Sequence, residues 1–243
     1  MDRPSLPDGV TALLFDVDGV LTNTATVHAK AWKQTFDRVL ERLGGDQRPF
    51  DAREDYEAYV DGKSRLDGVR GFLDSRGIEL PEGSADDAAD ALTVHGIGRA
   101  KNDLVLELIR RDGVEGYDDA AAFVRDARKH GYKTAVVSSS ANAREALKSV
   151  GLEDCFDAWV DGVRIERDHL HGKPAPDTFV AAAKDLGVEP GAAAVFEDAE
   201  AGVKAGHDGG FGLVVGVDRT GHADELREHG ADVVVERLTD VAL

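Results

Sequence analysis

The sequence predicts an α/β protein with one parallel sheet that is interrupted by an all-helical insertion. After Gly116, short apolar runs alternate with amphipathic helical patterns, as expected for parallel strands connected by helices on both faces of a sheet. An apolar run of the same kind lies at residues 10–15, but from there to about residue 110 the pattern is helical, without a convincing strand. The insertion therefore leaves the sheet at the carboxyl end of its first strand.

The first half of the chain contains one predicted strand, at 10–15, followed by helices. Apolar residues recur at helical spacing before Gly44-Gly45 ends the first helix, and these residues are Trp32, Phe36, Val39 or Leu40, and Leu43. The serine and acidic residues at 84–87 predict a helix N-terminus, and a further helix is expected at 101–111.

In the second half, strands and helices alternate. Strands are predicted where apolar residues cluster, at 134–137, 158–160, 192–196, 213–217 and, as an edge strand, 232–235. Helices are predicted where apolar residues recur at helical spacing, at 118–130, 141–150, 177–186 and 200–205. Gly151 and Gly187 are typical helix-ending residues.

Two aspartates follow the first predicted strand, in the segment Asp16-Val17-Asp18-Gly19. Residues two apart leave a strand on the same side, so Asp16 and Asp18 are expected to converge at the carboxyl edge of the sheet, where open α/β sheets bind ligands. Two carboxylates in one pocket need a proton or a cation between them. Mg²⁺ meets that need, although such a pair by itself also caps turns.

Three further polar clusters follow predicted strands or open helices, and each has an ordinary structural explanation. Ser138-Ser139-Ser140 can bind a phosphate or cap a helix. Lys173 lies in a proline turn. Glu197-Asp198 can bind Mg²⁺ or form the acidic start of a helix. Together with Asp16 and Asp18 they supply a nucleophile, a metal shell, a hydroxyl-and-amide cradle and a cation. That set predicts phosphoryl transfer through an aspartyl-phosphate.

The composition excludes several classes of protein. The formal charge of the 243-residue chain is −18, from 47 acidic and 29 basic residues, which disfavours nucleic acid and anionic membrane surfaces as partners. The single cysteine, Cys155, excludes an internal disulfide, and no signal peptide or spanning apolar run is evident. We therefore expect a cytoplasmic monomer that acts on a small molecule.

The four clusters resemble the motifs of the haloacid dehalogenase (HAD) superfamily, in order and with suitable spacing. Residues 15–22 (Phe-Asp-Val-Asp-Gly-Val-Leu-Thr) resemble its first motif, Ser138 the second, Lys173 the third and Glu197-Asp198 the fourth. The resemblance implies a Rossmann-like core, assigned to residues 1–25 and 112–243, and a helical cap domain, assigned to residues 26–111.

The resemblance is closest to the β-phosphoglucomutase family, on the segments 22–32, 62–65, 99–103, 138–142 and 172–177. It implies that Asp16 is the nucleophile and that Asp18 protonates the leaving oxygen and later deprotonates the acceptor. Ser138, the Ser139 amide and Lys173 are implied to hold the transferring phosphate. The implied Mg²⁺ ligands are Asp16, Asp18, Glu197 and Asp198.

The same resemblance implies contacts for the rest of the substrate, a glucose bisphosphate. Arg65, Ser140 and Asn142 are implied to bind its other phosphate, and His28 and Lys101 to position cap and substrate. Thr24 is implied to lie at the hinge between core and cap. The predicted substrate-binding set is completed by Trp32, Gly62 and Ser64.

The chain departs from the family pattern at three positions. Ala141 and Ala100 stand where basic residues are common in the family, and Asn23 replaces an aspartate. The first interpretation is a mutase that interconverts β-glucose 1-phosphate and glucose 6-phosphate, and the alternative is a Mg²⁺-dependent phosphatase of a small sugar phosphate. A non-catalytic sugar-phosphate sensor is disfavoured because no motif residue is missing, and dehalogenase or phosphonate chemistry does not fit the residues.

Overall fold

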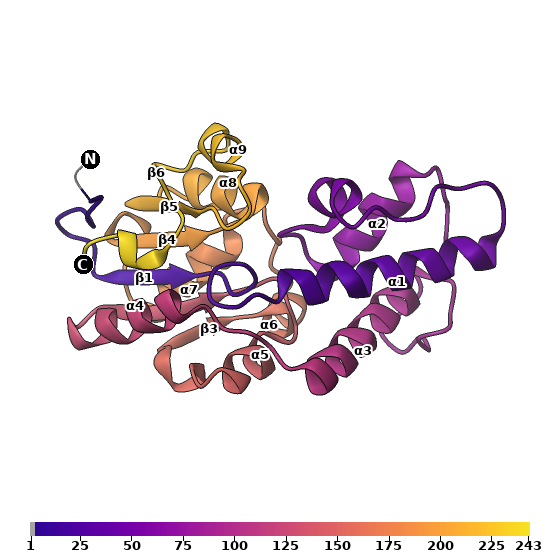
Figure 1. Ribbon diagram of the computed structural model, residues 1–243, viewed down its shortest axis with the longest axis horizontal. Coiled ribbons are helices and arrows are strands. Elements are labelled where there is room, and N and C mark those ends of the chain that lie inside the picture. Colours follow the sequence, from indigo (N-terminus) through magenta and orange to yellow (C-terminus); the bar gives the residue numbers. More distant parts are fainter. Residues whose placement is uncertain (1–2) are drawn as a thin grey trace. The chain divides into compact units, whose positions relative to one another are not determined.

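The computed structural model describes residues 3–243, and its core is a six-stranded parallel sheet (Figure 1). The strands are β1 (Ala12–Phe15), β2 (Lys133–Val137), β3 (Ala158–Val160), β4 (Ala193–Glu197), β5 (Leu213–Val217) and β6 (Val233–Val235). Their order in the sheet is β3-β2-β1-β4-β5-β6. The α/β fold with a parallel sheet is therefore confirmed, and β6 lies at its edge as predicted.

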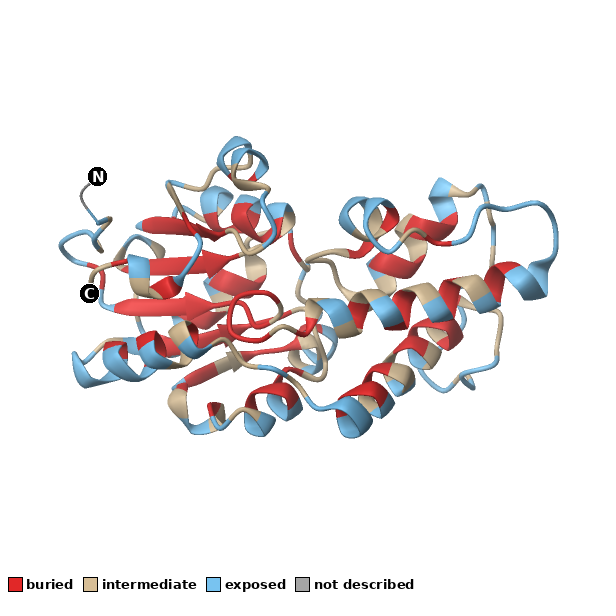
Figure 2. Cartoon of the chain, viewed as in Figure 1, coloured by how far each residue is buried: buried red, intermediate tan, exposed pale blue. Residues whose placement is uncertain are grey.

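Helices cover both faces of this sheet, so its strands are buried on two sides (Figure 2). On one face Leu13 and Phe15 of β1 pack in a core with α4 (Asp118–Lys129) and α5 (Ala143–Ser149). Leu14 faces the other core, which is formed with α6 (Gly162–Arg167), α7 (Asp177–Leu186), α8 (Glu200–Asp208) and α9 (Ala223–Glu228). Burial on both faces explains why the strands are continuous apolar runs in the sequence.

The register of the central strands aligns their carboxyl ends. Phe15 at the end of β1 pairs with Val136 of β2 and with Phe196 of β4, although these strands are far apart in the sequence. Parallel pairing of this kind brings the residues that follow each strand to the same edge. This alignment, rather than sequence proximity, brings Asp16, Ser138 and Glu197 to one edge of the sheet.

The chain divides into two compact units, one formed by the residues up to Thr24 together with Val114–Leu243, the other by Ala25–Gly113. The second unit contains α1 (Ala25–Leu43), the π-helix η1 (Tyr56–Val60), α2 (Arg65–Ser75) and α3 (Val94–Asp112), with no strand among its residues. Its core is aromatic: the ring of Phe36 lies 4.0 Å from that of Phe72 and 4.9 Å from that of Trp32. The remaining short elements are the 3₁₀ helices η2 (Glu153–Cys155), η3 (Pro190–Ala192) and η4 (Leu238–Asp240).

The structure corrects one helix prediction and extends others. No helix begins at Ser84, because the hydroxyls of Ser84 and Thr93 both donate to the Asp87 carboxylate in a loop. Thr93 is the true N-cap, and its hydroxyl oxygen accepts the Gly96 N–H, so α3 starts before the predicted 101–111 segment. Helices α6 and α9 were not predicted, because they have six residues each and are too short for a clear helical period.

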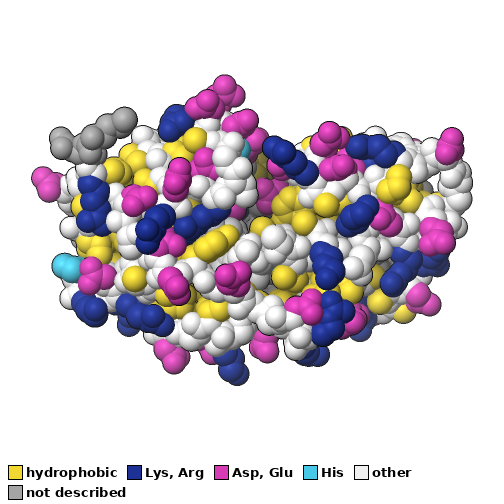
Figure 3. Space-filling view, viewed as in Figure 1, with side chains coloured by type: hydrophobic (Ala, Val, Ile, Leu, Met, Phe, Trp, Pro, Cys, Tyr) yellow, Lys and Arg dark blue, Asp and Glu magenta, His cyan; other side chains and the backbone are white. Residues whose placement is uncertain are grey.

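The visible surface carries acidic and basic side chains intermixed, in keeping with the chain's charged composition (Figure 3). Within residues 3–243, the structure contains no helix with both the length and the apolarity needed to span a bilayer.

The aromatic core of the second unit generates a stability prediction. Phe36 is fully buried between Trp32 and Phe72, so Phe36→Ala is expected to lower the free energy of unfolding by about 3–5 kcal/mol. Urea unfolding followed by far-UV circular dichroism measures the loss. Leu43→Ala is the control: its side chain is exposed, and a change of less than about 0.5 kcal/mol is expected. Equal losses in the two variants would contradict the assignment of this core.

Candidate active site

A buried lysine contacts groups at the ends of three different strands. The Lys173 ammonium donates to Asp16 Oδ1 and to Glu197 Oε2, both at 2.6 Å, and to the Val137 carbonyl at 3.1 Å. The Lys173 side chain is completely buried, and those of Asp16 and Glu197 nearly so. Although burial favours the neutral amine, the two carboxylates raise the pKa of Lys173, so it stays charged. Lys173 was predicted to lie in the site, but its pairing with two carboxylates was not predicted.

The carboxylates around Lys173 carry more negative charge than one ammonium balances. Burial raises the pKa of Asp16 to about 6, against the opposing effect of Lys173, and Asp18 adds to the rise. Burial and the nearby Asp16 carboxylate raise the pKa of Glu197 to about 7. Both shifts have the same physical cause: the site holds excess negative charge away from water and favours a proton or a cation.

The structure contains a cluster that suits a hard divalent cation. Asp16, Glu197 and Asp198 each offer a carboxylate oxygen, and these oxygens lie within 4.8 Å of one another. Oxygen donors and surplus negative charge are what Mg²⁺ requires of a protein site. The carboxylates of Asp16, Glu197 and Asp198 therefore fit the predicted Mg²⁺. The Asp18 side chain is not in this cluster. Asp18 is predicted to offer its main-chain carbonyl to the metal, and that role remains a prediction.

Two glycines make room for the acidic side chains. A Cβ on Gly19 would lie 1.7 Å from Asp198 Oδ2, and Gly19 also has a φ of +90°. A Cβ on Gly202 would lie 2.0 Å from Cδ of Glu197. Neither Gly19 nor Gly202 was among the predicted site residues. The spacing of these glycines from the acidic residues in the sequence does not predict the contacts, because the contacts depend on how the chain folds.

Asp18 belongs to a threonine network at the end of the first unit. The Thr24 hydroxyl donates a hydrogen bond to Asp18 Oδ1. The hydroxyl oxygens of Thr24 and Thr22 are 2.8 Å apart. Both threonines are buried, and Thr22 also donates to the Val17 carbonyl. The network fixes the Asp18 carboxyl next to the segment where the chain leaves the first unit. Thr22 was not among the predicted site residues.

The serine cluster forms a tight loop after β2. The Ser138 hydroxyl is buried and accepts the Ser140 N–H at 3.0 Å, while the Ser140 hydroxyl accepts the Asn142 N–H at 3.2 Å. A Cβ on Gly162 would lie 2.7 Å from the Ser139 carbonyl oxygen, so only glycine lets α6 begin this close to the loop. Ser138, Ser139, Ser140 and Asn142 thus lie in one compact turn.

In the second unit, His28, Trp32 and Lys101 lie together. The Lys101 ammonium is 3.0 Å from His28 Nδ1 and 4.7 Å from the centre of the Trp32 ring. Burial and the Lys101 charge hold the pKa of His28 well below its usual 6.5, so the imidazole is neutral and its Nδ1 accepts from Lys101. The hydrogen-bonded ammonium of Lys101 on α3 therefore lies next to the aromatic ring of Trp32 on α1.

The other predicted residues of the second unit lie at the start of α2. Gly62 has a φ of +66°, which suits glycine and turns the chain after η1. Ser64 is the N-cap of α2, and its hydroxyl oxygen accepts the Asp67 N–H. Arg65 donates to Asn102 Oδ1 at 3.0 Å, which joins α2 to α3 next to Lys101.

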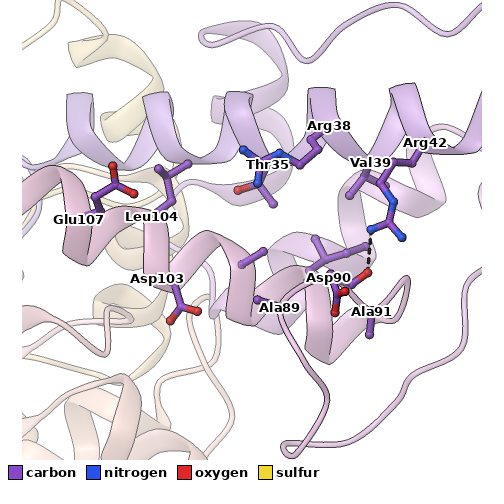
Figure 4. A pocket seen from close by; sticks show the side chains of 12 residues that line it. Thr35, Arg38, Val39, Arg42, Ala89, Asp90, Ala91, Asp103, Leu104 and Glu107 are labelled. Carbon is purple, nitrogen blue, oxygen red and sulfur yellow. Dashed lines mark hydrogen bonds between the residues drawn. The ribbon is translucent and has the colours of Figure 1, made fainter.

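A separate cavity of about 330 Å³ lies between α1, α3 and the 89–91 loop (Figure 4). Its floor includes Val39 and Leu104, and Arg42 donates to the Asp90 carbonyl at its rim. None of the predicted site residues lines it, so this cavity is not the site described above.

Comparison with known proteins decides the family. The haloacid dehalogenase-like hydrolase family profile matches residues 10–210. This chain belongs to that family. The predicted HAD membership is thereby confirmed, and the acidic cluster with Lys173 is this HAD protein's candidate active site.

Relatives of this HAD protein include mutases and phosphatases. It is 52% identical to a β-phosphoglucomutase of Mycobacterium tuberculosis, an alignment that covers 97% of this chain and 93% of the relative. It is 32% identical to a fructose-1-phosphate phosphatase of Escherichia coli, with 83% and 94% covered. A crystal structure of β-phosphoglucomutase from Clostridium difficile matches with a TM-score of 0.76 at 25% identity, covering 94% of this chain and 92% of that one.

The raised pKa of Asp16 predicts a specific pH dependence of stability in metal-free buffer. Between its usual 3.8 and about 6, folded Asp16 keeps a proton that the unfolded chain has released, so its contribution to stability falls as pH rises. Asp16→Asn removes this titration. The difference in unfolding free energy, wild type minus variant, is therefore expected to fall between about pH 4 and pH 6.

Urea denaturation in EDTA across this pH range measures the difference. Asp168→Asn is the control, because the hydrogen bond from Arg167 lowers the pKa of Asp168 to about 2, so its wild-type-minus-variant difference is not expected to fall over this range. A flat difference for Asp16→Asn would show that the Asp16 carboxyl is not desolvated as described.

Proposed function

We propose that this protein is a β-phosphoglucomutase, which interconverts β-D-glucose 1-phosphate and glucose 6-phosphate through an aspartyl-phosphate at Asp16. The observation that carries the proposal is the buried Asp16 carboxylate held by Lys173 beside an acidic cluster. This arrangement supports phosphoryl transfer as the chemistry. The 52% identity to mycobacterial β-phosphoglucomutase supports the sugar phosphate as the substrate.

The proposed reaction has two phosphoryl transfers. In the first, an Asp16 carboxylate oxygen bonds to phosphorus while the bond from phosphorus to the sugar oxygen breaks, and Asp18 gives its proton to that leaving oxygen. In the second, a sugar hydroxyl bonds to the same phosphorus, its proton passes to Asp18, and the bond to Asp16 breaks. The hydrogen bond from Thr24 holds the Asp18 carboxyl in one orientation for both proton transfers.

The remaining residues of the first unit bind and orient the phosphoryl group in this proposal. Lys173 balances its charge, while the Ser138 hydroxyl and the Ser139 amide hold its oxygens. Asp16, Glu197 and Asp198 would hold Mg²⁺, with Asp18 as a further proposed ligand. When bound, Mg²⁺ supplies positive charge that offsets the carboxylates and the phosphoryl oxygens.

We further propose that the second unit is a cap domain that binds the rest of the substrate. Arg65 would hold the distal phosphate together with Ser140 and Asn142. His28, Trp32 and Lys101, with Gly62 and Ser64, would orient the sugar. A cap of this kind excludes water, which a mutase needs because the phosphoryl group must reach a sugar hydroxyl instead.

A sugar-phosphate phosphatase is the second candidate function. It is favoured by Ala141, which leaves the serine loop without a cation at that position, and by the similarity to an E. coli phosphatase. The same Asp16 and Asp18 would serve both reactions, with water replacing the sugar hydroxyl as acceptor.

A product assay separates the two functions. Enzyme, Mg²⁺, β-glucose 1-phosphate and a trace of glucose 1,6-bisphosphate are expected to yield glucose 6-phosphate, whereas release of free phosphate would favour the phosphatase. Asp16→Asn is expected to reduce turnover at least about a thousandfold with the fold intact by circular dichroism, because the nucleophile is lost. Normal turnover in that variant would refute the covalent mechanism.

The proposed distal-phosphate contact predicts a selective defect. Arg65→Ala is expected to lower kcat/KM for the mutase reaction about 10- to 100-fold, since a hydrogen bond between charged groups is lost. Hydrolysis of p-nitrophenyl phosphate, which has no second phosphate, is expected to stay within about twofold. Arg70→Ala on the same helix is the matched control, because that guanidinium already pairs with Asp67 and Glu82. Equal loss of both activities in Arg65→Ala would remove Arg65 from the distal site.

A further inference from the structure

A histidine outside the predicted site contacts the acidic cluster through its main chain. His222 Nε2 lies 2.9 Å from the carbonyl oxygen of Asp198. A carbonyl oxygen only accepts, so the Nε2–H donates whatever the charge of the ring. Nδ1 of the same ring faces the Thr220 hydroxyl at 2.8 Å and the Asp218 carboxylate at 3.3 Å. His222 belongs to none of the four motifs.

The loop that carries His222 has its own internal support. After β5, Asp218 Oδ1 accepts the N–H groups of Thr220, Gly221 and His222, at 3.1, 2.6 and 3.1 Å. Three backbone donors on one carboxylate oxygen fix the turn without any help from Asp198. The ring of His222 is therefore presented from a folded loop.

The same loop is also anchored to the rest of the first unit. The Arg219 guanidinium donates to both carboxylate oxygens of Asp119, at 3.1 and 3.0 Å, and to the Glu236 carbonyl at 2.8 Å. It also lies 4.1 Å from the centre of the Tyr117 ring, and its side chain is largely buried. Because these anchors do not involve Asp198, His222 reaches the acidic cluster from a fixed support.

Asp198 is thus confined from two sides. Its carboxylate lies against the Cα of Gly19, where no side chain fits, and its carbonyl oxygen is held by His222. The carboxylates of Asp16, Glu197 and Asp198 offer oxygens within 4.8 Å of one another, so without a cation between them they repel one another. A fixed main chain at residue 198 opposes the movement by which this repulsion would separate the carboxylates.

We propose that His222 is a positioning residue that holds Asp198 in the geometry required to bind a divalent cation, and so sets the affinity of the acidic cluster for Mg²⁺. The inference rests on the proposed function, since it assumes that the cluster binds Mg²⁺. It assigns His222 no contact with substrate and no proton transfer.

Isothermal titration of metal-free protein with Mg²⁺ tests this role directly. His222→Ala is expected to bind Mg²⁺ about five- to tenfold more weakly, as for the loss of one partly buried hydrogen bond. His222→Gln is expected to stay within about twofold of wild type, because its amide N–H has the reach of Nε2. His222→Asn, whose amide reaches only as far as Nδ1, is expected to resemble His222→Ala. Turnover of all variants is expected to recover at saturating Mg²⁺.

The controls separate positioning from general destabilisation. His229→Ala removes a histidine of the same unit whose Nε2 lies 3.3 Å from Glu200, and its Mg²⁺ affinity is expected to equal that of wild type. A merely structural role would lower the melting temperature of metal-free His222→Ala and leave its Mg²⁺ affinity unchanged, which would overturn the inference. If His222→Ala does not fold, equal affinities of the Gln and Asn variants overturn it.

The wild-type titration distinguishes this inference from the proposed function. Binding by wild type with no change in the His222 variants would overturn only the positioning role. Absence of Mg²⁺ binding by wild type would overturn both the role of His222 and the proposed metal.

Discussion

The arrangement of the candidate site depends on one buried ammonium. Lys173 contacts Asp16, which follows β1, Glu197 at the end of β4 and the carbonyl of Val137 at the end of β2, so a single group ties three adjacent strand ends together. A buried charge is costly without partners, and removing either side of such a pair leaves an uncompensated ion. The lysine therefore serves the fold and the chemistry at once: it makes burial of Asp16 tolerable and provides positive charge where a phosphoryl group is proposed to transfer.

The incomplete balance of charge around Lys173 gives the site its chemical character. One ammonium faces Asp16 and Glu197, with Asp18 and Asp198 nearby, and burial together with the neighbouring carboxylates raises the pKa values of Asp16 and Glu197. A site with this excess favours a cation, and a bound cation in turn makes an anionic substrate acceptable. Close packing is what keeps the carboxylates together: Gly19 and Gly202 leave space for Asp198 and Glu197 where any larger side chain would displace them.

The two compact units contribute different chemistry. The first holds a nucleophile candidate, an acid-base candidate and the metal cluster, all at one edge of the sheet. The second holds Lys101 against neutral His28, and Arg65 against Asn102, and these cations are proposed to bind the parts of a substrate that do not react. Under the proposed function, mutase and phosphatase share the first set of residues and differ in how well the second excludes water. This division explains why relatives of both kinds resemble this chain.

The sequence alone determined the fold class, the strands and the family, because apolar runs buried on both faces and the spacing of Asp16, Ser138, Lys173 and Glu197 are local patterns. It misplaced a helix at Ser84, where hydroxyls bond to Asp87 instead of capping a helix, and it missed α6 and α9, which are too short to show a period. Only the tertiary structure decided that Lys173 bridges two carboxylates, that Thr24 holds Asp18, and that Gly202 and His222 adjoin the acidic residues. The geometry of those contacts comes from the strand register and from packing, even where the partners are close in the chain, and no local pattern records it.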